Sequence, residues 1–127
     1  MEIPSSYKVF IDEIREMFPE ASKLADRNHR DLGFEPEDEA FSIWLENFSK
    51  ATDEYMNKDQ SDEVAQHFSF FSLKVRTGTP EIRQLIDVSY VENLFWSATN
   101  SSIEKYWPKL PQSLKDLYVQ FHGRELL

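Results

Sequence analysis

The sequence predicts an all-α fold, a single-domain bundle of about five to seven helices that spans residues 1–127. Apolar residues recur at helical spacing along most of the chain. The three glycines and six prolines mostly fall between these runs. No segment alternates apolar and polar residues for long enough to require a strand. Because 40% of the residues are hydrophobic and 14% are aromatic, the chain can bury one core.

The first helix is expected to follow Pro4, and Pro19 either breaks it or opens a second helix as the first helical residue. Gly33 is placed to end that second helix in a left-handed conformation. Pro36 opens the strongest segment, residues 37–57. The apolar face of the first helix is formed by Tyr7, Phe10, Ile11, Ile14 and Phe18, and that of the strongest segment by Phe41, Trp44, Leu45, Phe48, Thr52 and Tyr55.

Ser61 is a plausible N-cap for a helix over residues 62–76, which ends at Gly78. Its spacing of Val64, Phe68 and other apolar residues favours a central, well-buried helix. The density of aromatic and β-branched residues in 68–75 leaves a strand open as the alternative.

Thr79 and Pro80 restart the chain as N-cap and first helical residue. Residues 80–98 carry too many apolar side chains for one stripe, so this segment is either well buried or broken near 87–89. Residues 100–102 offer a further cap. The last helix is expected over residues 111–122, between the rigid Trp107-Pro108-Lys109-Leu110-Pro111 corner and Gly123.

The composition excludes several classes of protein. The chain has no cysteine, so it cannot contain disulfides, thiolate zinc sites, iron–sulfur clusters or a cysteine nucleophile. No apolar run is long enough to cross a membrane. Residues 1–6 lack a basic stretch followed by an apolar one, so we expect no secretory signal and a cytoplasmic location.

The net charge of −9 argues against binding to free nucleic acid, because the chain would repel a phosphate backbone. Nearly all of the excess negative charge lies in residues 1–66. One interpretation is a solvated, solubilising surface. The other is an electrostatic surface that attracts a basic protein partner.

Acidic residues form a pattern within the expected helix 37–57. Glu39, Glu46 and Asp53 repeat every seven residues and predict an acidic stripe opposite the apolar face. Further acids come before it, in its first turn, and after it, around the next helix start. We therefore predict a partner-binding surface formed by Glu37, Asp38, Glu39, Glu46, Asp53, Asp59, Asp62 and Glu63.

No catalytic motif is recognisable, and we predict no catalytic residue, no cofactor and no metal. Glu63 and His67 are spaced to share a helix face and could both bind a divalent cation, with Asp62 as a third donor. A second spaced pair is missing, so ordinary helix-surface polarity explains this trio better. Trp96 and Trp107 flank residues 97–102, where they either form a recognition pocket or complete the core.

The C-terminal block carries a resemblance. Val91-Glu92-Asn93-Leu94 and the pattern Trp107-Pro108-x-Leu110-Pro111-x-x-Leu114-Lys115-x-Leu117-Tyr118 resemble small uncharacterised bacterial all-α domains, some of which look like immunity proteins of polymorphic-toxin systems. The resemblance implies a non-catalytic protein that binds and occludes a cognate toxin, and it transfers no site residue. A helical adaptor or chaperone-like module for a basic partner is the alternative, followed by an enzyme with an unrecognised site.

Overall fold

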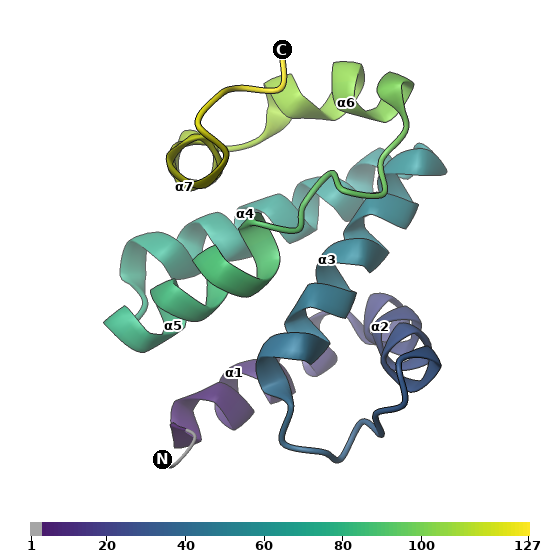
Figure 1. Cartoon of the computed structure of the whole chain (residues 1–127), viewed down its shortest axis with the longest axis vertical. Helices are drawn as coiled ribbons and strands as arrows, with labels where there is room; N and C mark the ends of the chain where they lie inside the picture. The colour runs from purple at the N-terminus through teal and green to yellow at the C-terminus, as the bar shows by residue number, and fades with distance from the viewer. Residues whose placement is uncertain (1–3) are drawn as a thin grey trace.

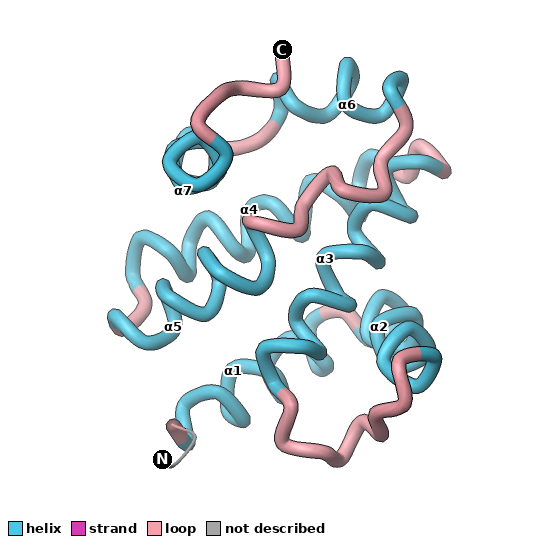
Figure 2. The backbone as a smooth tube through the Cα atoms, in the orientation of Figure 1, coloured by secondary structure: helices cyan, strands magenta, loops and turns pink. Residues whose placement is uncertain are grey.

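The computed structural model describes residues 4–127, and within this range it contains helices and no strand (Figures 1 and 2). The all-α prediction is therefore confirmed. The expected absence of a secretory signal concerns residues 1–6, of which 1–3 lie outside the described residues. The elements are α1 (Ser5–Met17), α2 (Pro19–Asp31), α3 (Phe41–Asn57), α4 (Ser61–Thr77), α5 (Pro80–Leu85), the π-helix η1 (Ile86–Val91), α6 (Asn100–Tyr106), the 3-10 helix η2 (Trp107–Lys109) and α7 (Gln112–His122).

The predicted punctuation of the chain is largely confirmed. Pro19 is the first residue of α2, and Gly33 follows that helix with a φ of 93°. The Thr79 hydroxyl accepts a hydrogen bond from the backbone N–H of Ile82 and caps α5. Gly123 ends α7 in the left-handed conformation, with a φ of 79°. These positions are set by local backbone chemistry, which the sequence displays directly.

The predicted start of the third helix is wrong. α3 begins at Phe41, and the acids expected in its first turn lie in the loop 32–40. The reason is a local turn, because the Asp38 carboxylate accepts a 2.9 Å hydrogen bond from the backbone N–H of Glu35. The Asp38 N–H in turn donates to the Glu35 carbonyl. An aspartate that satisfies its own turn in this way competes with the helix.

Residues 68–75 are helical, which settles the strand alternative against the strand. In the segment 80–98 most apolar side chains are buried, Val88 and Trp96 are exposed, and α5 continues without a break into the π-helix η1 at Ile86. The Tyr90 ring stacks on Phe71 at 3.8 Å between centroids. The Tyr90 carbonyl accepts a hydrogen bond from the Ser49 hydroxyl. The widened turn therefore occurs where η1 packs on α3 and α4. Thr99, rather than residues 100–102, caps α6.

The helix α3 crosses the middle of the molecule (Figure 1). It packs against α1, α2, α4, α6 and η1. Phe48 and Phe71 lie at the centre of a continuous aromatic core. The Trp107–Pro111 corner buries Trp107 against Tyr118, so it seats α7 on the rest of the bundle as its rigid geometry predicts. Among the described residues, no helix has the length and apolar character needed to cross a bilayer.

Candidate functional site

Three of the predicted acids meet at the turn between α3 and α4. Asp59, Asp62 and Glu63 line an open hollow of about 500 Å³ together with Gln60, Ser61 and Gln66. Asp62 and Glu63 occupy the first turn of α4, where the helix dipole favours negative charge. The tight turn at Asp59, whose φ is 57°, brings these acids together. The hollow is therefore lined by negative charge.

Asp59 is already partnered within the chain. Its carboxylate accepts hydrogen bonds from Lys105 and from the Tyr106 hydroxyl, the latter at 2.6 Å. These two hydrogen bonds hold the pKa of Asp59 below its ordinary value. Asp59 thus fixes α6 to the α3–α4 turn, and the negative charge left for a partner comes mainly from Asp62 and Glu63.

An apolar groove adjoins the acidic hollow. It has a volume of about 420 Å³ and runs between the α1–α2 junction and the outer face of α4. Met17 and Leu73 line it and remain 60% and 47% exposed. Gln66 lines both the groove and the hollow, so the two cavities lie next to each other on α4. Its remaining lining residues are Phe18, Ala65, Ser69 and Phe70.

Behind the hollow, Glu63 connects to a buried polar network. Its carboxylate lies 2.7 Å from Nε2 of His67, and Nδ1 of His67 lies 2.9 Å from the Thr52 hydroxyl. The Thr52 hydroxyl also lies 3.0 Å from the hydroxyl of Tyr90. Burial lowers the pKa of His67, so the ring is neutral, and the carboxylate keeps its proton on Nε2. His67 Nδ1 then accepts from Thr52, and Thr52 accepts from Tyr90.

This network corrects the prediction of ordinary surface polarity for Glu63 and His67, whereas Asp62 is exposed and lies outside the network. His67 is fully buried, with 0% exposure, and it packs between Phe18 and Phe48. The spacing of Glu63 and His67 correctly predicted that their side chains meet. No group of three potential metal ligands occurs among the described residues. The hydrogen bond to His67 orients the Glu63 carboxylate, which stays half-buried at the rim of the hollow.

Asp53 is not a surface residue, and its predicted place in a partner-binding stripe is wrong. Its exposure is 0%. Its two carboxylate oxygens accept hydrogen bonds from the backbone N–H groups of Phe95 and Ser97, at 2.8 and 2.9 Å. Burial raises the pKa of Asp53 to about 7 although these N–H donors oppose the shift. The segment that follows η1 covers the face of α3 that the heptad pattern assigns to solvent.

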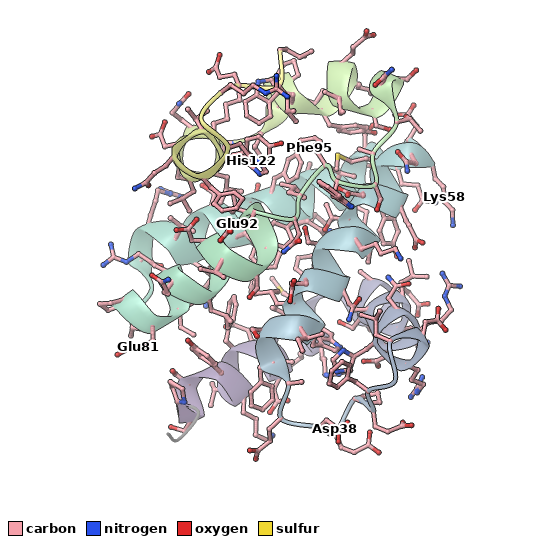
Figure 3. All side chains as sticks on the ribbon, in the orientation of Figure 1. Asp38, Lys58, Glu81, Glu92, Phe95 and His122 are labelled. Carbon is pink, nitrogen blue, oxygen red and sulfur yellow. The ribbon has the colours of Figure 1, made fainter. Side chains whose placement is uncertain are left out.

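The other predicted acids lie apart from the hollow. Glu37, Asp38 and Glu39 belong to the loop 32–40, at the opposite end of α3 (Asp38 in Figure 3). A helix of 17 residues separates them from Asp59, which corresponds to about 25 Å. Glu46 is an exposed residue of α3, and partial burial of its carboxyl raises its pKa. The eight predicted residues therefore form separate groups, and only Asp59, Asp62 and Glu63 share a cavity.

Two features of the surface escaped the sequence reasoning. The groove depends on Met17, which lies at the edge of the apolar stripe of α1, seven residues after Phe10, so its spacing does not distinguish it from a core residue. A second acidic group gathers around Glu92, where Asp87 and Glu46 act on its carboxyl. Burial and then the repulsion from Asp87 raise the pKa of Glu92, although the charge of His122 opposes the shift. Of the two tryptophans near residues 97–102, Trp107 belongs to the core and Trp96 is exposed.

The fold and its surfaces define a compact all-α domain that carries an apolar groove beside an acidic hollow. The chain belongs to the DUF7674 family, a domain of unknown function, whose model matches residues 11–123. Neither the curated proteins nor the solved structures contain a match to this chain.

Proposed function

We propose that this protein is a non-catalytic binding module that captures a basic segment of a partner protein in the groove and hollow along α4. The observation that carries the proposal is that the apolar groove and the acidic hollow adjoin at Gln66. An exposed apolar groove seats apolar anchors, and carboxylates at one end select lysine or arginine. The overall charge of −9 would speed the encounter with such a partner.

The more specific proposal is that the partner is a bacterial toxin which this chain neutralises by covering its basic active-site surface. The resemblance of the C-terminal block to immunity-like domains supports this choice, as does the small, acidic character of the chain. An immunity protein must bind early, and complementary charge accelerates association at low salt. A chaperone or adaptor for another basic protein is the alternative partner class.

Calorimetric titration with the protein encoded by the neighbouring gene tests the proposal. Leu73→Glu, in the groove, and Asp62→Lys, at the rim of the hollow, should each weaken binding about tenfold, and Asp62→Lys should also flatten the salt dependence. Leu32→Glu is the matched apolar control, since Leu32 is 63% exposed but lies outside the groove. Glu37→Lys is the matched charge control in the distant loop.

The outcomes separate the possibilities. Tight binding that both site variants weaken and both controls preserve supports the groove, and loss of the toxin's activity in the complex supports neutralisation. Binding that only Glu37→Lys weakens places the interface on the loop 32–40 and overturns the groove. Absence of binding to the neighbouring protein overturns the toxin proposal.

A further inference from the structure

The outer face of α4 carries a stripe of exposed side chains. Its members are Asp62, Ala65, Ser69, Leu73 and Arg76. Steps of three and four residues keep them on one side of the helix. Ser69 is the middle position. Ala65 and Leu73 lie four residues to either side of it, and Asp62 and Arg76 lie seven residues to either side.

The charges at the two ends of this stripe are opposite, and both are available to a partner. Neither Asp62 nor Arg76 forms an ion pair within residues 4–127. The Arg76 Nε donates to the Ser72 carbonyl at 3.3 Å, which leaves the two terminal amino groups of the guanidinium for another acceptor. The nearby Lys74, by contrast, is paired with Glu13 at 2.8 Å. The stripe therefore offers one negative and one positive group, about 21 Å apart along the helix axis.

These side chains are complementary to a second copy of the same stripe. When two α4 helices run antiparallel with Ser69 facing Ser69, each Asp62 faces Arg76 of the other copy. Each Leu73 then faces Ala65 of the other copy, so a large side chain meets a small one. The charged contact and the apolar contact are each formed twice, as a two-fold interface requires.

The shape of this surface permits a close approach. Ala65 and Ser69 form a low ridge, since both side chains are small. The apolar groove lies on one flank of the ridge, and a smaller hollow of about 130 Å³, lined by Tyr106 and Lys109, lies on the other. Ridges of an incoming helix fit into such grooves, and small residues at the contact allow the helix axes to approach to about 8 Å. Leu73, which is 47% exposed in the single chain, becomes buried in this arrangement.

We propose that two copies of this chain form a dimer through antiparallel α4 helices, with the two-fold axis at Ser69. The proposal does not rest on the partner segment proposed above. Both would cover the same groove, so a second copy and a partner exclude each other. The net charge of −9 on each copy opposes association. At about 0.15 M salt the Debye length is about 8 Å, so this general repulsion is screened while the contact between Asp62 and Arg76 persists.

Sedimentation equilibrium at about 0.15 M salt tests the charged contact. The wild type should shift from monomer towards dimer between about 10 µM and about 1 mM, the range of a small, transient interface. Asp62→Arg and Arg76→Asp each put like charges together in both contacts, so each should weaken self-association about tenfold. An equimolar mixture of the two variants should restore it, because every arginine in the mixed dimer faces an aspartate. The matched controls are Glu37→Arg in the loop 32–40 and Arg83→Asp on α5, which change the net charge equally and should leave self-association unchanged.

Introduced cysteines test the register of the two helices. The chain has no cysteine of its own, so a disulfide reports only the introduced position. Ser69→Cys should form a disulfide-linked dimer under mild oxidation, because this position meets its own counterpart at the two-fold axis. Leu73→Cys alone should link poorly. Its equimolar mixture with Ala65→Cys should link well, since these two positions face each other.

The dimer is absent when the wild type stays monomeric at about 1 mM, and this result overturns the proposal. A dimer that Asp62→Arg and Arg76→Asp both leave intact forms through another surface and overturns it as well. A mixture of these variants that stays monomeric, or Leu73→Cys that links mainly to itself, overturns the antiparallel register. Circular dichroism checks that each variant keeps the helical content of the wild type. No partner protein is present in these measurements, so failure here is distinct from failure of the proposed function.

Discussion

Asp53 and Asp59 lie six residues apart near the end of α3, and both bind groups from the segment 95–106. Asp53 is fully buried and holds two backbone N–H groups. Asp59 is exposed and holds the side chains of Lys105 and Tyr106. The two aspartates thus attach the same segment to α3, one in the interior and one at the surface.

The difference in environment reverses the effect on the pKa. Burial raises the pKa of Asp53 to about 7, because its two N–H partners do not fully replace water around the charge. Hydrogen bonds from Lys105 and Tyr106 lower the pKa of Asp59. Burial opposes them only weakly, because Asp59 remains exposed to water. Ionisation of an aspartate is therefore unfavourable at position 53 and favourable at position 59. A charge pattern in a sequence does not reveal which of the two applies.

The largest expected effect comes from removing each of the two side chains in a separate variant. Asp53→Ala leaves the buried N–H of Phe95 and the partly buried N–H of Ser97 without their acceptor and opens a void in the interior, so we expect the free energy of unfolding to fall by about 3–5 kcal/mol. Asp59→Ala should change it far less, because exposed ion pairs contribute little. Urea denaturation of both variants measures the difference. Similar losses in the two variants would contradict the contrast.

The pH dependence of stability tests the raised pKa of Asp53. The unfolded chain loses this proton near pH 3.8 and the folded chain near pH 7. The folded state therefore binds the extra proton between these values, and the contribution of Asp53 to stability falls as the pH rises from about 4 to about 7. The fall is at most about 4 kcal/mol and is complete above pH 7.

The control for this measurement is Asp53→Asn, which mimics the protonated side chain at every pH. Urea denaturation at pH 5 and pH 8 should show the wild type losing more stability than Asp53→Asn over this interval. Other acids with raised pKa values, such as Glu46 and Asp87, titrate in both proteins and cancel in the comparison. Equal pH dependence in the two proteins would mean that Asp53 is ionised throughout.

The sequence was sufficient where the cause of a feature lies within a few residues. Pro19, Thr79 and Gly123 mark helix ends through their own backbone or side-chain chemistry, and all three positions are confirmed. The i, i+4 spacing of Glu63 and His67 likewise predicted their contact. The amphipathic patterns gave the all-α class, because apolar periodicity depends only on neighbouring turns.

The sequence failed where a distant segment decides the outcome. Periodicity placed Asp53 opposite the apolar face of α3, but the turn around Trp96, more than 40 residues later, covers that side. The groove arises from the approach of Met17 to α4, which no local pattern encodes. Glu39 lies outside the predicted stripe because it belongs to the loop 32–40, and α3 begins only at Phe41. Pattern predicts which residues share a face and does not predict which faces are covered.

The smallest expected effect concerns an uncharged polar group of the interior, the hydroxyl of Thr52. Thr52→Val keeps the shape of the side chain but removes the hydroxyl that joins His67 to Tyr90, so both would lose a buried partner. We expect a loss of about 1–3 kcal/mol in the free energy of unfolding. Tyr90→Phe should cost less in the Thr52→Val background than in the wild type, because the tyrosine hydroxyl has then already lost its acceptor. Additive losses in this double-mutant cycle would show that the two hydroxyls act independently.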